Sequence, residues 1–355
     1  MDIQAFIATR KGLFQLRDDT RLELVAFEGV PVSMVLASAQ HDVCYAALDH
    51  GHFGVKLHRS DDAGSNWTEV SAPAYPKVDD PAMEAPSLEL IWSMAFASQD
   101  PMTLWAGTIP GGLFYSADGG ETWSLNENLW SHKNEKWFGG GYDNPGIHSI
   151  CIHPNDSRHI TVAISVAGVY QSRDGGNSWA NKSSGMRAEY LPPDQQLDTV
   201  GQDPHRLQMC PAKPDRLWVQ HHNGIFVSDN AAENWRAVAK VEPSAFGFSV
   251  AVHPENPDTA WFVPAIKDEC RVPVNAQLLV NRTRDGGRTF EALTTGLPDF
   301  SFDLVYRHGL DVDNTGDKLL MGSTTGNLWL SLDQGDSWKR LSSFLPPVYA
   351  LGFLK

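Results

Sequence analysis

The sequence contains few cysteines and no long apolar run. Among its 355 residues are four cysteines, none in a Cys-x-x-Cys pair, and three of them lie in short apolar runs. We therefore expect buried free thiols in a reducing compartment. No apolar run approaches the roughly 20 residues that span a bilayer, and the first ten residues lack the basic and apolar regions of a signal peptide. These absences predict a cytoplasmic protein.

Positive charge is also scarce. The chain carries 28 lysines and arginines against 43 aspartates and glutamates, for a formal net charge of -15. A chain this acidic creates no overall field that attracts phosphate backbones or anionic lipid. We therefore expect neither a nucleic acid nor a membrane surface as partner. The sequence does not indicate the oligomeric state.

Helical periodicity is missing as well, and a β-rich repeat stands in its place. The repeat is marked by a motif of the form Ser/Thr-x-Asp-x-Gly-x-Thr/Ser/Asn-Trp. Its six copies begin at Ser60, Ser116, Ser172, Ser228, Thr283 and Ser331, so successive starts are 56, 56, 56, 55 and 48 positions apart. The fourth copy has Asn230 and Ala232 at the Asp and Gly positions, and the fifth ends on Phe290. Such a steady period indicates a repeat architecture.

Each motif lies among short β-rich runs bounded by Gly, Pro, Asn and Asp. Three runs precede the third copy, at His148–Ile152, Ile160–Ile164 and Gly168–Tyr170, and Trp179 opens a fourth. Each unit therefore predicts four antiparallel strands, named A to D in chain order, with the motif as the turn between C and D.

The two ends of the chain together complete a seventh unit. The sequence pattern predicts strands B, C and D within residues 1–27 and a strand A within residues 347–355. Joining these segments in one sheet would close a ring and remove its free edges. We predict an all-β fold over 1–355: a single seven-bladed β-propeller domain of four-stranded antiparallel blades, the last blade closed by strands from both termini.

The residues of the motif suit a tight turn. Glycine supplies backbone angles that other residues resist, the carboxylate and hydroxyl accept turn N–H groups, and tryptophan buries a large apolar area. Because the same acid recurs from unit to unit, we assign a structural role to Asp62, Asp118, Asp174, Asp285 and Asp333.

These motifs resemble Asp-box (BNR) repeats, and the whole chain resembles the Asp-box β-propeller superfamily. That superfamily includes sialidases, xyloglucanase-type glycosidases, the sortilin propeller and photosystem II assembly factors; the chain is most similar to bacterial sialidase-like BNR-repeat proteins. The resemblance implies that the active centre lies on the face opposite the boxes. No Arg-Ile-Pro segment of the sialidase type occurs, and sialidases have six blades, so no sialidase catalytic residue is carried over.

The long connections of the predicted propeller share one face, formed by the D–A connections and B–C loops. His148, His205 and His222 lie at this face on two neighbouring blades. Neutral imidazoles that converge there would bind one divalent metal ion, with Zn²⁺, Mn²⁺ or Fe²⁺ as the candidates. The alternative is that each histidine separately hydrogen-bonds loop backbone.

Other candidate residues lie on the same face. Acid–base or nucleophilic chemistry needs a base or a pair of carboxylates, and we assign it to His148, His205, Asp143 and Glu189. Guanidinium, imidazole and aromatic groups suit a polar or anionic ligand, and we assign substrate binding to Arg271, His308, Arg307, Tyr190 and Trp92.

Two functions fit this distribution of residues. The first is a hydrolase or lyase, either glycosidase-like or metal-dependent, that acts on a small polar or sugar-like substrate in the mouth of the central channel. The second is a non-catalytic propeller that binds a protein or a glycan, as the assembly-factor relatives do. Converging histidines in a deep pocket favour the enzyme, and a broad apolar or charged surface patch favours the binding protein.

Overall fold

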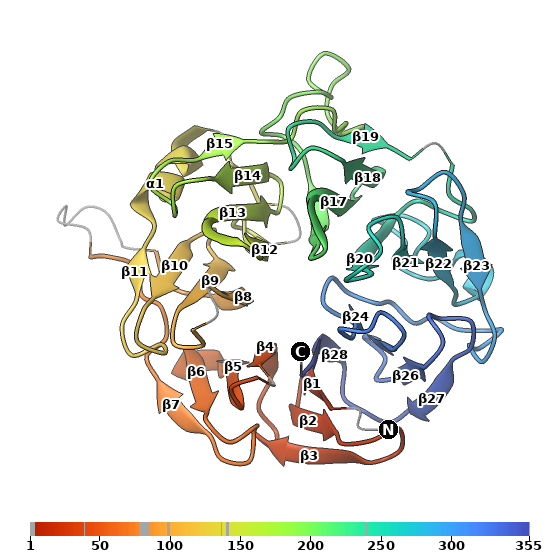
Figure 1. The fold of residues 1–355 in the computed structure, drawn as a ribbon, viewed down its shortest axis with the longest axis horizontal. Helices are drawn as coiled ribbons and strands as arrows, with labels where there is room; N and C mark the ends of the chain where they lie inside the picture. Colours follow the sequence, from red (N-terminus) through yellow and green to blue (C-terminus); the bar gives the residue numbers. More distant parts are fainter. Residues whose placement is uncertain are drawn as a thin grey trace.

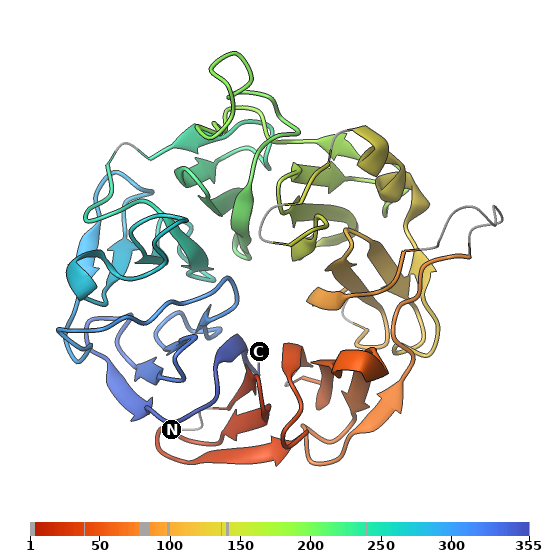
Figure 2. The ribbon, with the colours of Figure 1, turned by 180° about the vertical axis from the view of Figure 1, so that it is seen from behind.

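Seven four-stranded antiparallel sheets form a closed ring in the computed structural model (Figures 1 and 2). The structure describes residues 4–38, 40–77, 86–97, 100–135, 137–139, 142–238 and 240–354. Each sheet is one blade, with its strands hydrogen-bonded in consecutive order. The first strand of every blade lies nearest the centre of the ring and the last lies at its rim (Figure 1). The predicted seven-bladed propeller is confirmed.

The strands have the following bounds. Blade 1 contains β4 (Val32–Ser38), β5 (Val43–Asp49), β6 (Val55–Ser60) and β7 (Thr68–Val70). Blade 2 contains β8 (Leu90–Phe96), β9 (Leu104–Ile109), β10 (Leu113–Ser116) and β11 (Ser124–Leu125). Blade 3 contains β12 (Ile147–His153), β13 (Asp156–Ile164), β14 (Gly168–Ser172) and β15 (Ala180–Asn181). Blade 4 contains β16 (Pro204–Cys210), β17 (Lys213–His221), β18 (Gly224–Ser228) and β19 (Arg236–Ala237). Blade 5 contains β20 (Gly247–Val252), β21 (Ala260–Pro264), β22 (Val280–Thr283) and β23 (Glu291–Leu293). Blade 6 contains β24 (Leu310–Val312), β25 (Leu319–Gly322), β26 (Leu328–Ser331) and β27 (Lys339–Ser342).

The seventh blade joins both ends of the chain, as predicted. It contains β28 (Val348–Phe353), β1 (Ala5–Thr9), β2 (Gly12–Leu16) and β3 (Leu22–Ala26), in that order. β28 is antiparallel to β1, and Ala5 pairs with Phe353. The ring is therefore closed by a sheet whose innermost strand comes from the far end of the sequence.

Helices contribute little to the described part of the chain. They are α1 (Glu127–Trp130) and the short 3₁₀ segments η1 (Gly51–Phe53), η2 (Ser131–Glu135) and η3 (Val274–Ala276). Within the described ranges, no helix is long and apolar enough to cross a membrane. The cysteines are free thiols, and burial raises the pKa of Cys44 to about 12 and that of Cys151 to about 11.

The Asp box of blade 3 forms the predicted turn between β14 and β15. Asp174 Oδ1 accepts hydrogen bonds from the Ser172 hydroxyl and the Ser178 N–H, each 2.8 Å long, and its Oδ2 accepts the Ser178 hydroxyl at 2.6 Å. The Gly176 N–H donates to Ser172 Oγ at 2.8 Å, and Gly176 has the left-handed φ of 90°. The box aspartate therefore satisfies turn groups that the strand ladder leaves unpaired.

The fourth box forms the same turn although Asn230 and Ala232 replace the aspartate and the glycine of the motif. Asn230 Oδ1 accepts the Ser228 hydroxyl at 2.9 Å and the Asn234 N–H at 3.0 Å, so an amide oxygen replaces the carboxylate. Ala232 occupies the glycine position at φ 68°. A left-handed alanine costs about 1–2 kcal/mol, and burial of Ala232 in the core of this blade accompanies that conformation.

Tryptophans fill the spaces between blades. Trp218, Trp261 and Trp329 are among the largest fully buried side chains. Trp261 of blade 5 packs in one cluster with Leu310 of blade 6, so the cluster bridges neighbouring sheets. Each buried ring removes about 150–250 Å² from water, which corresponds to about 4–6 kcal/mol of transfer free energy. This packing holds the blades at fixed positions around the centre.

Candidate active site

A cavity of about 550 Å³ opens at one end of the ring. Its lining comes from the starts of the innermost strands and from the D–A connections and B–C loops, whereas the boxes lie in the C–D turns at the other ends of the strands. The predicted division between a box face and a loop-rich face thus holds. The lining consists of Ser33, Asp49, Leu90, Trp92, Phe138, Gly139, Tyr142, Val166, Tyr190, Asp203, His205, His222, Phe248, Asp268, Arg271, Tyr306, Arg307, His308 and Tyr349.

A register shift recurs near the cavity end of the innermost strand in six blades. The residues inside these shifts are Ser33, Trp92, His148, His205, Phe248 with Ser249, and Tyr349. Such a bulge re-aims a side chain that regular alternation would place elsewhere. Ser33, Trp92, His205, Phe248 and Tyr349 belong to the cavity lining. The bulges at equivalent positions of several blades therefore direct side chains into the same cavity.

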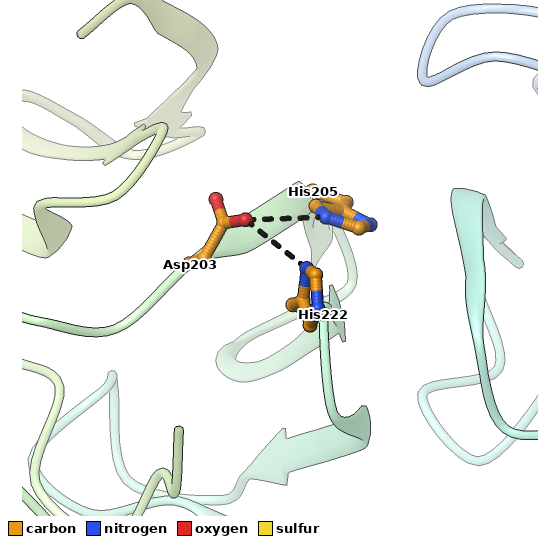
Figure 3. Close-up of side chains that lie close together, drawn as sticks. All are labelled: Asp203, His205 and His222. Atoms are coloured by element: carbon orange, nitrogen blue, oxygen red, sulfur yellow. Dashed lines mark ion pairs between the residues drawn. The ribbon is translucent and has the colours of Figure 1, made fainter. Parts of the chain in front are cut away.

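Asp203, His205 and His222 form a compact group in blade 4 (Figure 3). Asp203 Oδ2 lies 3.3 Å from His205 Nε2 and 3.5 Å from His222 Nδ1, and all three candidate ligand atoms lie within 4.8 Å of one another. Asp203 directly precedes β16, His205 is its second residue, and His222 follows β17. The antiparallel β16–β17 pair thus brings the three side chains together.

Asp203 is held in place and held ionised. Its Oδ1 accepts the Val166 N–H at 3.1 Å, and its own N–H donates to His221 Nε2 at 3.0 Å. Burial opposes ionisation, but the charge of protonated His205, hydrogen bonds donated by His205 and His222, and the positive charge of Arg307 outweigh it and hold the pKa of Asp203 well below its usual range. Asp203 is therefore a carboxylate at neutral pH.

His205 is oriented on three sides. It stacks on Phe248 with ring centroids 4.6 Å apart and planes inclined by 12°, and its Nδ1 lies 2.7 Å from the Gly247 carbonyl oxygen. Nδ1 therefore carries a proton and donates it to that oxygen. Burial lowers the pKa of His205, although Asp203 acts in the opposite direction. In the neutral ring, Nε2 is then the lone-pair nitrogen, and it faces the carboxylate.

Arg307 supplies positive charge to the same cavity. Its guanidinium lies 4.7 Å from the ring centroid of Trp92 and 5.4 Å from that of Phe248. Its buried Nε has no hydrogen-bond partner among the described residues. Arg307 is thus positioned by aromatic faces, and its side chain forms part of the cavity lining.

Arg271 is a second guanidinium group over Phe248, 5.2 Å from the ring centroid. In contrast to Arg307, it has an acidic partner: its Nη2 donates to Asp268 Oδ1 at 2.6 Å. About 40% of the Arg271 side chain is exposed, so this pair lies at the rim of the cavity.

His308 and His148 form a second histidine pair. His308 Nε2 lies 2.9 Å from the His148 carbonyl oxygen and donates to it, which leaves His308 Nδ1 as the lone-pair nitrogen. Burial lowers the pKa of both imidazoles well below the usual value, so both are neutral at pH 7. His148 packs edge-on against Trp92, with ring centroids 5.5 Å apart, and its Nδ1 lies 3.0 Å from Ser149 Oγ.

Most residues that the sequence analysis assigned to the site line the cavity. They are His205, His222, Arg271, Arg307, His308, Tyr190 and Trp92. Three do not. His148 is fully buried and lies outside the histidine group, where Asp203 takes the third position. Asp143 and Glu189 are exposed loop residues outside the lining, and Glu189 lies 4.0 Å from Arg187.

Asp203 and Phe248 are the main residues that the sequence analysis missed. Asp203 lies two positions before His205, and residues two apart in an extended chain point to the same side. That spacing was the available signal for Asp203. The signal for Phe248 was its position at the start of an A strand, equivalent to that of Trp92 and His205.

The repeat, the ring and the cavity define the class of this protein: it is a seven-bladed β-propeller built on BNR/Asp-box repeats. The BNR/Asp-box repeat family matches residues 114–125, which include the second box.

Comparison with individual proteins extends this classification. The chain is 24% identical over 234 residues to an oligoxyloglucan-reducing end-specific xyloglucanase from Emericella nidulans, a match that covers 63% of this chain and 28% of the xyloglucanase. Among solved structures, an ancestral GH74 enzyme is similar with a TM-score of 0.62 and 18% identity, over 97% of this chain and 40% of that one. YCF48 bound to D1 peptide is similar with a TM-score of 0.60 and 14% identity, over 94% and 90%. The chain thus spans less than half of the xyloglucanase and of the ancestral GH74 enzyme, and the structural likenesses show the shared fold.

Proposed function

We propose that this protein is a hydrolase or lyase that acts on a small, polar, sugar-like substrate in the cavity at the loop-rich end of the ring. The observation that carries the proposal is the placement of Arg307 between two aromatic rings, beside the buried Asp203–histidine group, in one cavity of about 550 Å³. A space of this size suits a small ligand. The similarity to a xyloglucanase supports a sugar as the substrate class.

The cavity favours a substrate with an anionic group. Arg307 and Arg271 both lie over the Phe248 ring, and both line the cavity. A carboxylate on the substrate would accept charge-assisted hydrogen bonds from these guanidinium groups. The aromatic side chains around them can pack against the C–H faces of a sugar ring. We therefore expect a sugar acid to bind better than a neutral sugar.

A simple two-carboxylate glycosidase mechanism fits the cavity less well. That mechanism needs one carboxyl group that is protonated when it meets the substrate. Asp203 has a lowered pKa and cannot supply that proton at neutral pH. Asp268 is bound to Arg271, and Asp49 lies exposed at the cavity edge. The lone-pair nitrogen of His308, Nδ1, is instead available to accept a hydrogen bond from a substrate hydroxyl group.

A panel of oligosaccharides tests this proposal. Purified protein is incubated with oligoxyloglucans, neutral oligosaccharides and oligosaccharides that contain uronic acids. The masses of the products are then determined by mass spectrometry. Hydrolysis adds one water across the cleaved bond, whereas elimination by a lyase leaves an unsaturated product without added water. Turnover that disappears in Arg307→Met, and persists in a variant of the exposed Arg158, supports the proposal. No binding and no turnover for any member of the panel contradicts it.

The second candidate is a propeller that binds a peptide without catalysis. Exposed phenylalanines favour it, since Phe300, Phe302 and Phe344 have exposed fractions of 74%, 57% and 96%. Phe300 and Phe302 pack edge to face, 5.3 Å apart, in the connection that leads to blade 6. A similar propeller has been solved as YCF48 bound to D1 peptide. Peptide-array binding that Phe300→Ser abolishes, with no sugar binding in the cavity, would favour this candidate.

A further inference from the structure

We propose that Asp203, His205 and His222 bind one divalent transition-metal ion at the wall of the cavity. Binding of the ion follows from the geometry of these three side chains. Its participation in the reaction rests, in addition, on the function proposed above. The site has one carboxylate and two imidazoles, and it differs from the three-histidine site that the sequence predicted by the exchange of His148 for Asp203.

The distances between the ligand atoms fit a metal ion. Zinc bonds to imidazole nitrogen and carboxylate oxygen are about 2.0–2.2 Å long, so two ligands of a tetrahedral ion lie about 3.4 Å apart. The observed distances from Asp203 Oδ2 are 3.3 Å to His205 Nε2 and 3.5 Å to His222 Nδ1. The two imidazole nitrogens lie within 4.8 Å of each other. To reach the tetrahedral separation, the two imidazole nitrogens would have to approach each other by at most about 1.4 Å.

The surrounding hydrogen bonds prepare the ligands for a metal ion. The Gly247 carbonyl oxygen holds the proton of His205 on Nδ1, so the Nε2 lone pair is directed at the carboxylate oxygen 3.3 Å away. Two electron-rich atoms at this distance require a proton or a cation between them. Asp203 Oδ1 is fixed by the Val166 N–H, which leaves Oδ2 for the shared position. Metal-binding histidines and carboxylates are commonly oriented by such outer hydrogen bonds.

A proton between Asp203 and His205 is the competing explanation. It would give an imidazolium–carboxylate pair in a buried place, and only 2% of His205 is exposed. Removing two opposite charges from water in this way is costly. In that explanation His222 Nδ1 also carries a proton and donates it to the same carboxylate oxygen, 3.5 Å away. One divalent ion accounts for both imidazoles and for the carboxylate at once.

The ligand set also indicates the type of ion and of site. Two imidazole nitrogens and one carboxylate oxygen suit Zn²⁺, Fe²⁺ or Mn²⁺. Three protein ligands leave at least one position open, which distinguishes catalytic metal sites from closed structural ones. Asp203, His205 and His222 all line the cavity, so the open position faces the space where the substrate is proposed to bind.

Metal titration of untagged protein tests the site. The protein is stripped with a chelator and titrated calorimetrically with Zn²⁺, Mn²⁺ and, without oxygen, Fe²⁺. We expect one equivalent of at least one ion to bind, with a rise in Tm. His222→Gln should weaken binding at least 100-fold, and Asp203→Asn should do the same while it retains the shape of the carboxylate. The matched control is His50→Gln, on the same face in the B–C loop of blade 1, and it should bind like wild type.

Two outcomes would overturn the proposal. One is the failure of the stripped wild-type protein to bind any of the three ions. The other is binding that neither His222→Gln nor Asp203→Asn weakens in protein that still unfolds cooperatively. Because the titration contains no substrate, it is independent of the proposed function. Bound metal without turnover would retain the site and reject the enzyme, whereas turnover by a protein that binds none of the three ions would reject the site and retain the enzyme.

Discussion

The guanidinium carbon of Arg307 lies 4.7 Å from the centre of the Trp92 ring, although 215 positions separate the two residues in the sequence. Trp92 comes from the innermost strand of blade 2, and Arg307 precedes that of blade 6. This contact across the end of the ring joins the cationic and aromatic parts of the cavity.

We predict that Arg307→Met weakens the binding of an anionic sugar by about tenfold to 100-fold. The loss of charge-assisted hydrogen bonds worth about 1.5–3 kcal/mol gives this range. Arg307→Lys should fall between wild type and Arg307→Met, since lysine retains the charge but lacks the planar fork. Calorimetry with a hexuronate and the matching neutral hexose measures both effects. Equal losses for the two sugars would show that Arg307 does not bind the anionic group.

The Asp boxes should affect stability and leave the cavity unchanged. We expect Asp174→Ala to lower the Tm by a few degrees, because it leaves the Ser178 N–H and hydroxyl without their acceptor. Asp174→Asn should cost less, since Asn230 already fills the equivalent position in the fourth box. Thermal unfolding measures the difference. Loss of ligand binding in folded Asp174→Ala would contradict the structural role of the box.

Acid should destabilise the protein through the same boxes. Hydrogen bonds from Asn66 and Ser178 lower the pKa of Asp62 and Asp174, respectively, from 3.8 to about 2. A carboxylate whose pKa is lowered by folding stabilises the folded state above its unfolded pKa, and this contribution is lost as the pH falls through the folded value. Stability should thus decline between about pH 4 and pH 2. Asp174→Asn should show a shallower decline in urea unfolding, and an unchanged decline would exclude Asp174 as a cause.

We predict that Tyr190→Phe lowers the thermal stability slightly and leaves metal binding intact. Its hydroxyl donates to the Gly201 carbonyl oxygen at 2.6 Å, and its ring packs edge-on against His222 with centroids 5.0 Å apart. One such hydrogen bond contributes about 1 kcal/mol, so Tyr190→Phe should lower the Tm by no more than about 3 °C. Because phenylalanine keeps the ring beside His222, metal binding should persist. Metal loss in this variant would mean that the hydroxyl, rather than the ring, positions His222.

The fold was predictable because its signal is repeated and local. Each box carries its own turn chemistry, and the steady spacing of Ser60, Ser116, Ser172 and Ser228 needs no knowledge of tertiary contacts. Even the closure of the ring could be predicted, since the partial units at the two ends complement each other.

The site was predictable only in part, because its geometry depends on bulges and neighbouring loops. His148 and His205 occupy equivalent bulges in blades 3 and 4, so they look alike in the sequence. They differ in surroundings: His205 faces Asp203, whereas His148 is covered by Trp92. Asp143 and Glu189 have the right chemistry and the right face, but their loops leave them outside the cavity.

A crystal structure of the protein with the best-binding sugar acid tests the central claim most directly. The account predicts ligand density in the cavity, with the anionic group within hydrogen-bond distance of Arg307 and the sugar beside Asp203, His205 and His222. Density confined to the outer strands, or to the exposed surface around Phe300 and Phe302, with the cavity filled only by water, would contradict it.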